Sequence, residues 1–186
     1  SQAALEKAGF VVRTQIIWNK MRLVISRGNY HWQHEAAWYA VRKGKSAGWT
    51  GSRTESTVWD IPKAQTSETG HGTQKPVECM ARPMRNNSKR GEAVYDPFVG
   101  SGTSIIAAEM EQRVCLAMDL DPGYVDVAVL RWQVFTGKIS TLEGDGRSFA
   151  VIAAERSKDA QRPVQAPVLD GAPGGLGVGD AEAHAG

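Results

Sequence analysis

Residues 93–109, AVYDPFVGSGTSIIAAE, carry the pattern from which the architecture of this protein can be inferred. The short apolar run at 93–96 predicts a strand, and the apolar spacing after the turn predicts a helix over 103–112. Gly100 and Gly102 lie in the turn between them. Glycines let the backbone approach a ligand closely, and the start of a helix offers free N–H groups. A G-x-G turn serves equally well as a plain tight corner, so the two glycines alone leave both interpretations open.

The segments after this turn continue the same alternation. The run 114–120 predicts a strand, and its continuous apolar character indicates a strand covered on both faces. Residues 122–137 begin with a Pro and end with a Gly, which is typical of a helix. The order strand, turn, helix, strand, helix predicts a βαβα unit with a parallel pair of strands, and therefore an α/β fold.

The chain before the turn is less regular. Residues 10–20 contain β-branched apolar residues that predict one or two strands, and 36–44 predicts another strand, with a short helix as the alternative. The Gly-, Ser- and Thr-rich stretch 44–70 shows little periodicity and is interpreted as irregular. A helix is expected over 75–88, although Pro83 should kink or shorten it.

Composition indicates one globular domain with a tail. Of the 186 residues 41% are apolar and 23% are charged, close to the average for globular proteins. We assign residues 1–150 to the domain and the Pro-, Gly- and Ala-rich stretch 151–186 to a disordered tail. The sequence has no apolar run long enough for a membrane span and no secretory signal. Two distant cysteines fit no metal spacing and suggest free thiols in a reducing cytoplasm.

Charge is divided unevenly along the chain. Residues 1–95 contain 15 Lys and Arg against 7 Asp and Glu, whereas residues 96–186 contain 7 against 13. A basic half suggests that this part of the protein faces a polyanion, and a solvated basic face without a partner is the alternative.

An acid after the second predicted strand bears on the ligand question. Asp119 follows Gly100 by 19 residues, the distance at which a carboxylate accepts hydrogen bonds from the ribose hydroxyls of a nucleoside cofactor. The alternative is a surface carboxylate at a strand end. The turn lacks both the ending of a P-loop and the third glycine of a dinucleotide site. Asp96 would repel a pyrophosphate but attract an ammonium or sulfonium, which favours S-adenosylmethionine over NAD or ATP.

Five short motifs together carry a family resemblance. DPFVGSGT (96–103), MDLDPGY (118–124), HGTQKP (71–76), IIWNK (16–20) and YHWQHE (30–35) resemble the DNA amino-methyltransferases of the permuted type that places the cofactor motifs last, often phage-encoded. The resemblance covers roughly residues 9–150. It implies a Rossmann-like methyltransferase fold, with a mostly parallel sheet and flanking helices, incomplete at the N-terminus.

The resemblance implies a set of cofactor residues. Asp119 would hold the ribose, Leu120 and Asp121 would lie beside the adenine, and the helix that begins at Lys75 and Pro76 would face the methionine carboxylate. The complete set implied for S-adenosylmethionine is Thr73, Lys75, Pro76, Asp96, Phe98, Gly100, Ser101, Gly102, Thr103, Asp119, Leu120 and Asp121.

The resemblance also implies a target-recognition region over residues 43–70. The basic residues expected to contact DNA phosphates are Arg42, Lys43, Lys45, Arg53 and Lys63. Trp49 and Trp59 would stack on a base or wedge beside it; the alternative is that both anchor the loop on the core.

The catalytic tetrapeptide of the family, which ends in Pro-Pro and an aromatic residue, does not occur, because the sequence has no Pro-Pro pair. The chain is therefore expected to be the C-terminal part of a longer enzyme, and a non-catalytic relative is the alternative. The catalytic residues stay unknown, and His34 and Glu35 are candidates only for lining the site.

The function implied is a restriction-modification enzyme that transfers a methyl group from S-adenosylmethionine to the exocyclic amine of a flipped adenine, or of a cytosine, in double-stranded DNA. Its expected location is the cytoplasm of a bacterium or of a phage-infected host cell. Two other classes stay open: a DNA-binding module that transfers no methyl group, and a methyltransferase acting on RNA or a small molecule.

Overall fold

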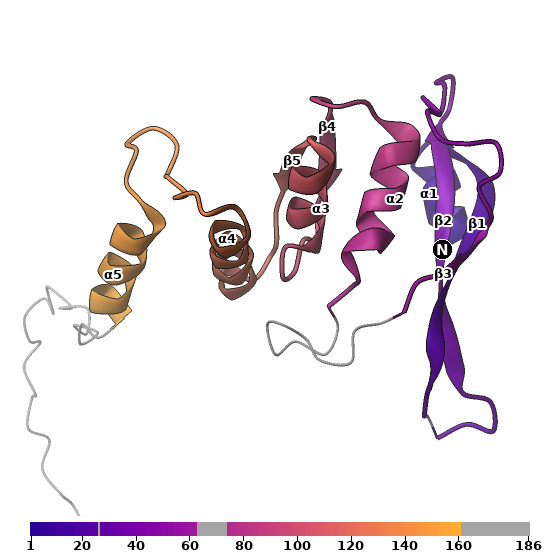
Figure 1. Cartoon of the computed structure of the whole chain (residues 1–186), viewed down its shortest axis with the longest axis horizontal. Coiled ribbons are helices and arrows are strands. Elements are labelled where there is room, and N and C mark those ends of the chain that lie inside the picture. Colours follow the sequence, from indigo (N-terminus) through magenta and orange to yellow (C-terminus); the bar gives the residue numbers. More distant parts are fainter. Residues whose placement is uncertain (26, 63–73, 161–186) are drawn as a thin grey trace, which may run out of the picture. The chain divides into compact units, whose positions relative to one another are not determined.

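The computed structural model describes residues 1–25, 27–62 and 74–160 (Figure 1). The chain divides into two units, Ser1–Phe149 and Ala150–Gly186. The first unit contains, in order, α1 (Gln2–Lys7), β1 (Phe10–Val24), β2 (Trp32–Arg42), β3 (Val58–Asp60), α2 (Val77–Asn87), β4 (Ala93–Asp96), α3 (Thr103–Glu111), β5 (Val114–Ala117) and α4 (Pro122–Thr136). A last helix, α5 (Phe149–Ala160), follows.

The predicted βαβα unit is confirmed. β4 and β5 pair in parallel from Ala93↔Val114 to Asp96↔Ala117, and α3 connects them. α4 begins at Pro122 and ends before Gly137, which has a left-handed φ of +69°. The helix ends where predicted because Gly adopts this conformation without steric cost.

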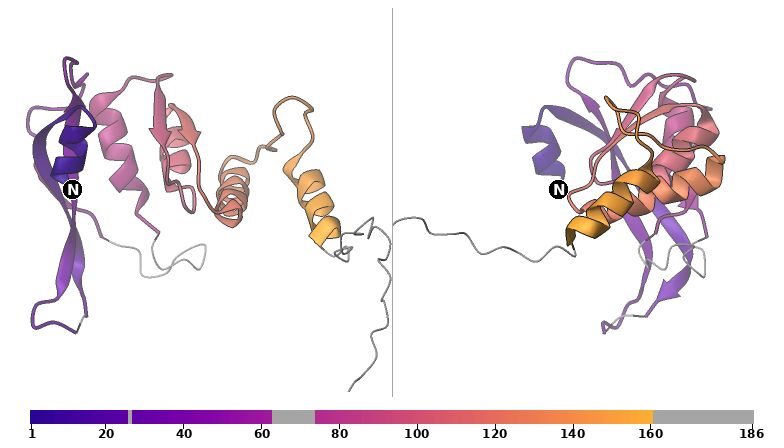
Figure 2. Two further views of the ribbon diagram at one scale, coloured as in Figure 1. Left: turned by 180° about the vertical axis from the view of Figure 1, so that it is seen from behind. Right: turned by 90° about the vertical axis from the view of Figure 1, so that its left-hand side faces the viewer.

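The strands form two sheets within the described residues. β1 pairs antiparallel with β2 and, over three residues from Ile17 to Asn19, parallel with β3; β4 and β5 form a separate sheet. The predicted strand over 10–20 is one long strand, and the strand predicted over 36–44 is confirmed as far as Arg42, where β2 ends in a turn. α2 lies between the two sheets (Figures 1 and 2).

α2 contributes to a hydrophobic cluster on each side. Toward β1, Cys79 packs with Trp18 and Ile61, and toward α3, Met84 packs with Ala107. The indole N–H of Trp18 donates to the Ile61 carbonyl at 2.6 Å, so the β3 end is also fixed to β1. The helix therefore joins both sheets through its opposite faces.

Pro83 does not end α2, which continues for four residues to Asn87. Proline removes one backbone donor and crowds the preceding turn. Local side chains support the turn that follows, because the Asn87 amide donates to the Pro83 carbonyl at 3.0 Å. At its C-terminal end α2 is one residue shorter than the helix predicted over 75–88.

The prediction that the 114–120 strand is covered on both faces is wrong for the described residues. Cys115 packs against the cluster of α2 and α3, whereas Val114 is 52% exposed and Leu116 is 55% exposed on the opposite face. Successive side chains of a strand alternate between faces, and no described residue covers the second face.

The prediction that residues 151–186 form a disordered tail is wrong for its first ten residues, which belong to α5. The segment FAVIAAERSKDA is rich in Ala and in charged residues with high helix propensity. The Pro- and Gly-rich composition begins only after it, and residues 161–186 lie outside the described ranges. None of the helices in the described ranges has the length and apolar character that a membrane span requires.

Candidate functional site

The two glycines of the turn have different roles. Gly102 has a φ of +83°, and a Cβ there would lie 3.0 Å from both Cα and Cβ of Ala128 in α4. Gly100 has a φ of +51°, and nothing lies within 4 Å of a Cβ built on it. Gly102 thus allows the turn to pack on α4, whereas Gly100 leaves its backbone open toward the space beside the turn.

Asp96 ends β4 and organises the start of the turn. One carboxylate oxygen accepts the Phe98 N–H at 3.0 Å, and the other accepts the hydroxyl of Ser104 from α3. The side chain therefore stands at the carboxyl end of the strand with its negative charge held in place by two donors.

Asp119 connects the turn to the loop after β5. Its two carboxylate oxygens accept the Gly100 N–H at 2.8 Å and the Asp121 N–H at 3.1 Å. These backbone donors, first that of Asp121 and then that of Gly100, hold the pKa of Asp119 below its ordinary value. Each oxygen keeps a second acceptor position, so the carboxylate fixes the spacing of the two loops and can still accept a hydrogen bond from a ligand.

Arg131 of α4 supports the other end of the turn. Its guanidinium donates to the Ser101 carbonyl at 3.2 Å and to the Thr103 hydroxyl at 3.1 Å. The Thr103 hydroxyl in turn donates to the Lys75 carbonyl at 3.4 Å. These contacts connect the turn with α4 on one side and with the segment that leads into α2 on the other.

A cleft of about 230 Å³ lies between the turn and the start of α2. Of the residues expected to hold the cofactor, it is lined by Lys75, Asp96, Phe98, Gly100, Ser101 and Thr103. The cleft is also lined by five residues that were not predicted from the sequence: Gln74, Met80, Val99, Ser104 and Tyr124. Gln74 and Val99 stand inside the quoted motifs, and the others lie in the first turns of α2, α3 and α4, where a helix start faces a ligand.

Several predicted cofactor residues do not line the cleft. Pro76 is the N-cap of α2, and Asp121 caps α4 by accepting the Gly123 N–H at 2.8 Å. Gly102, Asp119 and Leu120 do not line it either. Leu120 is 98% exposed, and Phe98, which does line the cleft, is 84% exposed, so two apolar side chains are left uncovered in the loops that Asp119 connects. Thr73 lies outside the described residues.

Glu35 forms an ionic cluster beside the cleft. Its carboxylate contacts the ammonium groups of Lys20 and Lys75, both at 2.9 Å, and each ammonium lies 5.8 Å from the Trp18 ring centroid. Burial opposes the charged form, but the hydrogen bonds from Lys75 and Lys20 outweigh it and lower the pKa of Glu35. Glu35 therefore positions Lys75, which lines the cleft, through an ion pair.

His34 is not part of this cluster. Neighbouring residues of a strand point to opposite faces of the sheet, and the His34 ring packs against Trp32 with centroids 5.6 Å apart. The structure thus brings one of the two predicted site-lining residues to the rim of the cleft.

The described part of the 43–70 region is partly fixed on α2. Thr50 donates its N–H to the Asn86 carbonyl at 2.8 Å and its hydroxyl to the Arg85 carbonyl at 2.7 Å. Trp59 packs on the Trp18 cluster and faces the Arg82 guanidinium at 5.4 Å. Trp59 therefore anchors the loop on the core, as the alternative interpretation held.

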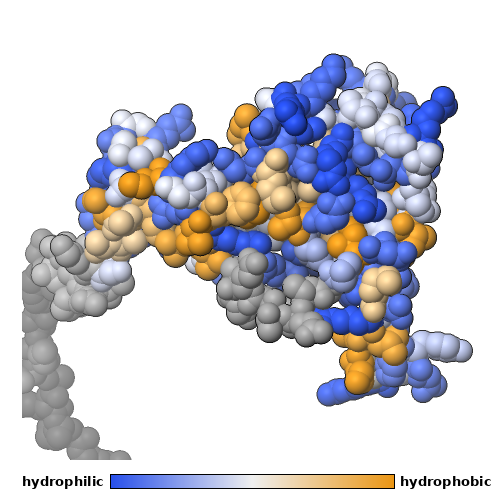
Figure 3. Space-filling model, in the orientation of Figure 1, coloured by the Kyte–Doolittle hydropathy of each residue, from blue (hydrophilic) through white to orange (hydrophobic). Residues whose placement is uncertain are grey.

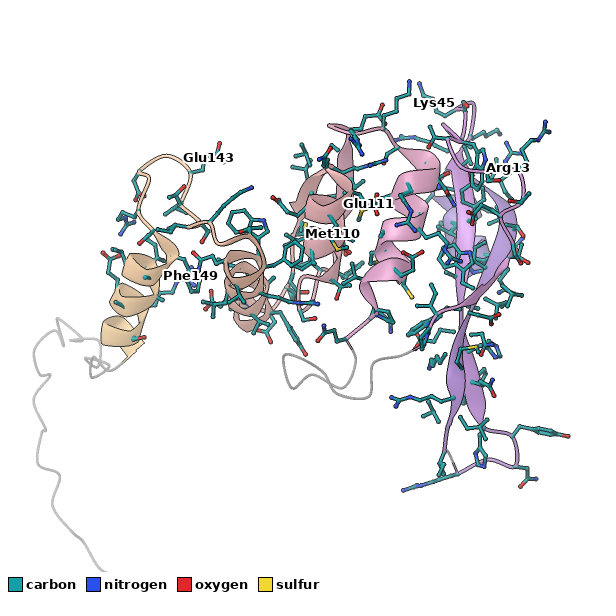
Figure 4. All side chains as sticks on the ribbon, viewed as in Figure 1. Arg13, Lys45, Met110, Glu111, Glu143 and Phe149 are labelled. Atoms are coloured by element: carbon teal, nitrogen blue, oxygen red, sulfur yellow. The ribbon has the colours of Figure 1, made fainter. Side chains whose placement is uncertain are left out.

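Trp49 is 44% exposed and meets the Tyr39 ring edge-on at 6.3 Å. Basic side chains surround the end of the β1–β2 sheet where Figure 4 labels Arg13 and Lys45. The exposed basic residues of the predicted DNA-binding set are Arg42, Lys43, Lys45 and Arg53, and within the described ranges none of them forms an ion pair. Lys63 lies outside the described residues.

Comparisons of sequence identify related proteins. A family model described as DNA methylase matches residues 1–130. The Type II methyltransferase M.Cfr9I of Citrobacter freundii is 30% identical over an alignment of 148 residues, and the match covers 70% of this chain and 47% of the relative. The Type II methyltransferase M2.DpnII of Streptococcus pneumoniae is 27% identical over an alignment of 147 residues, and the match covers 67% of this chain and 52% of that protein. The chain spans about half the length of the curated relatives it matches.

Comparisons of structure agree. The crystal structure of the M1.HpyAVI–SAM complex superposes with a TM-score of 0.61 at 27% identity, covering 69% of this chain and 66% of that chain. A putative DNA modification methylase of Thermus thermophilus, complexed with S-adenosyl-L-methionine, has a TM-score of 0.53 at 25% identity and covers 74% and 59%. The PvuII cytosine-N4-specific DNA methyltransferase reaches 0.59 at 15% identity, a likeness of fold alone, and covers 83% and 57%. The predicted Rossmann-like α/β class is confirmed.

Proposed function

This chain belongs to the DNA methylase family, and from that membership we propose that it supplies the S-adenosylmethionine-binding part of an enzyme that methylates exocyclic amines in double-stranded DNA. The proposal combines a cofactor site in the cleft beside the glycine turn with a DNA-contacting face on the β1–β2 sheet. Such an enzyme works where the DNA is, which is the cytoplasm of a bacterial or phage-infected cell.

The observation that carries the cofactor assignment is the pair of opposite charges in the cleft, Asp96 from β4 and Lys75 from the lead-in to α2. The methionine end of the cofactor is a zwitterion, so its ammonium suits the Asp96 carboxylate and its carboxylate suits Lys75 and the N-terminus of α2. NAD and ATP offer no ammonium group, and their phosphates would be repelled by Asp96.

The adenosine end would extend out of the cleft. Cofactor sites usually enclose about 300–1,000 Å³, so the 230 Å³ cleft accommodates part of the molecule. The exposed side chains of Phe98 and Leu120 offer apolar surface to the adenine ring. Asp119 has acceptor capacity left for the ribose hydroxyls, and its carboxylate is already fixed by backbone donors.

When bound, S-adenosylmethionine would supply a methyl group for in-line displacement: the exocyclic amine would form the new N–C bond as the C–S bond breaks, the cofactor would leave as a neutral thioether, and the amine would release a proton to solvent. The contribution of this chain is to hold the methyl donor and to position the charges around it. Groups that grip the flipped base are not assigned, because the sequence has no Pro-Pro tetrapeptide. We propose adenine as the target, with cytosine as the alternative.

The second candidate is a DNA-binding relative that keeps the cofactor cleft and transfers no methyl group. The two candidates share the cleft and the basic face, so cofactor binding does not separate them. Transfer of a radiolabelled methyl group to DNA does, because only the enzyme incorporates the label.

Calorimetry with S-adenosylhomocysteine tests the cofactor assignment. We expect binding to the wild-type chain and a roughly tenfold weaker affinity for Asp96→Asn or Lys75→Gln, since each loses one charge-assisted contact of about 1.5 kcal/mol. Arg147→Gln, which changes an exposed residue outside the cleft, serves as the matched control. ATP binding with equal affinity, or unchanged affinity in both cleft variants, would contradict the proposal.

A further inference from the structure

The β1–β2 hairpin extends well past the sheet that it belongs to (Figures 1 and 2). Its end, residues 21–25 and 27–32, is called the hairpin tip below. The tip exposes apolar side chains to an unusual degree: Ile25 is 86% exposed, Tyr30 94%, Trp32 63% and Leu23 60%. Large apolar surface that is exposed to solvent marks an interaction site in a folded protein.

The base of the hairpin is held firmly by Asn19. Its amide nitrogen donates to the Asp60 carboxylate of β3 at 2.7 Å, and its amide oxygen accepts from the Met21 N–H at 3.1 Å and from the Gln33 amide at 3.3 Å. One side chain thereby connects both strands of the hairpin with β3. The projection is therefore positioned by the sheet.

The backbone also changes direction at this point. The β1–β2 register shifts between Asn19 and Val24, and Met21 has a φ of +59°. A left-handed residue without glycine's freedom is strained, and such strain persists where the surrounding contacts impose it, often at functional sites. A register shift of this kind turns the strand and redirects its side chains.

The charge of the hairpin tip indicates what kind of partner it can bind. Arg22 and Arg27 are exposed, and residues 7–34 contain no Asp or Glu. Figure 3 shows hydrophilic and apolar side chains mixed on the projecting hairpin. Over residues 7–54 nine Lys and Arg stand against a single acid, Glu35, which Lys20 and Lys75 already engage. A surface with cations, aromatic rings and no acid suits a polyanion that also offers flat apolar faces.

We propose that the hairpin tip is a second DNA-contacting element, separate from the 43–70 region, and that it enters a groove of the duplex. Arg22 and Arg27 contact phosphates, and Ile25 and Tyr30 lie against base or sugar surface. This inference rests on the proposed function, because it takes double-stranded DNA as the substrate. A second copy of the chain fits less well, since two tips of equal positive charge repel each other.

Fluorescence anisotropy with a labelled duplex, over a series of salt concentrations, tests the cationic part. Each phosphate contact contributes about 0.9 to the slope of log affinity against log salt concentration. We expect Arg22→Gln combined with Arg27→Gln to lower the slope by about 1.8. The control is Arg90→Gln, an exposed arginine between α2 and β4, which should leave the slope unchanged.

The apolar part is tested by Ile25→Ser and Tyr30→Ser. We expect about tenfold weaker DNA binding with an unchanged salt slope, because apolar contact with base or sugar surface is lost without loss of charge. All variants should bind S-adenosylhomocysteine like the wild type and unfold at the same urea concentration, which shows that the fold and the cofactor site are intact.

The outcomes separate this inference from the proposed function. If the wild-type chain binds DNA and the tip variants bind equally well with equal slopes, the inference is overturned and the proposed function stands. If the wild type binds S-adenosylhomocysteine but no DNA, the DNA substrate and the inference both fail. Sedimentation that shows a dimer in the wild type and a monomer in the tip variants would assign the tip to a contact between copies and overturn the inference.

Discussion

Gly100 and Gly102 show how two identical residues in one turn serve different purposes. Both have positive φ, so a side chain at either position is strained. Only Gly102 lies against another element, the backbone of Ala128 in α4. The turn is therefore both a tight corner, at Gly102, and an open stretch of backbone, at Gly100.

This difference predicts unequal effects of alanine. We expect Gly100→Ala to lower the free energy of unfolding by about 1–2 kcal/mol, the cost of a left-handed alanine. Gly102→Ala should lower it by about 2–5 kcal/mol, because overpacking against α4 adds to the same strain. Urea unfolding measures both. Equal losses would show that α4 gives way to the added methyl group, contrary to the packing described above.

Glu35 predicts a pH dependence of stability. Burial raises the pKa of this carboxyl, but the hydrogen bonds and the charges of Lys75 and Lys20 together lower it below its ordinary value in the folded state. A lowered pKa stabilises the fold above the ordinary glutamate pKa, and the contribution is lost as the pH falls through the folded-state value.

We therefore expect Glu35→Gln to lower the free energy of unfolding at neutral pH by roughly 1 kcal/mol, after allowance for solvent screening of a carboxylate that is 40% exposed. The difference from wild type should shrink in acid, where Glu35 is protonated in both states. Glu55→Gln changes an exposed carboxylate and is the control. A difference that persists unchanged in acid would mean that the ion pairs contribute nothing.

Among the helices, α2 depends on a side chain from outside itself. The guanidinium of Arg113, just before β5, donates to the Ser88 carbonyl at 2.6 Å and to the Ser88 hydroxyl at 3.1 Å, and it reaches the Met84 carbonyl at 3.4 Å. The side chain is only 8% exposed. The last carbonyls of a helix have no partners within it, so Arg113 supplies donors that the helix lacks.

Arg113→Lys should therefore be destabilising although it keeps the charge. A lysine ammonium cannot reproduce the planar fork of donors, and we expect a loss of about 2–4 kcal/mol in the free energy of unfolding. Arg147→Lys, at an exposed ion pair with Asp145, should change it by less than about 0.5 kcal/mol. Urea unfolding of the two variants side by side provides the measurement. Near-equal effects would show that charge alone supports the end of α2.

A second set of ion pairs joins α2 to α3. Arg85 contacts Glu78 within α2 and Glu111 of α3, both at 2.6 Å, and Glu111 is labelled between the two helices in Figure 4. These pairs accompany the Met84 cluster, which joins the same two helices. They fix the helix that leads out of the cleft against the helix that follows the glycine turn.

In the first unit, residues of α2 belong to both hydrophobic clusters. We therefore predict that the two clusters unfold together. Burial raises the pKa of Cys79 to about 12, and burial followed by the charge of Asp96 raises the pKa of Cys115. Thiols with raised pKa values react slowly. Because Cys79 lies on the β1 side of α2 and Cys115 on the α3 side, they report on the two clusters separately.

We expect neither thiol to react with iodoacetamide at about pH 8 in the folded protein, because the thiolate is scarce there. With increasing urea both should become reactive at the same concentration, since loss of α2 removes packing from both clusters. Mass spectrometry of the labelled chain identifies which cysteine has reacted, and the Cys79→Ser variant controls for cross-assignment. Reaction of Cys115 at lower urea than Cys79 would show that the two sheets unfold independently.

The sequence was sufficient for the segment 93–137, with each element bounded to within three residues, because strand, turn and helix there depend on near neighbours. Gly100, Asp96 and Lys75, predicted from short motifs, line the cleft, and their contact with the cofactor stays a prediction. The prediction of disorder from composition was wrong for residues 151–160, because the Pro- and Gly-rich stretch on which it was based begins only after α5.

Contacts between residues far apart in the chain could not be predicted from the sequence. The order of residues does not show that Glu35 pairs with Lys75 or that Arg113 supports the end of α2. It also does not show that backbone N–H groups already donate to the Asp119 carboxylate. The exposure of the hairpin tip was not predicted, because exposed and buried apolar residues look alike in a sequence. Local periodicity follows from the geometry of one chain segment, whereas burial and ion pairing follow from which segments meet, and in this protein that meeting is fixed by the packing around α2.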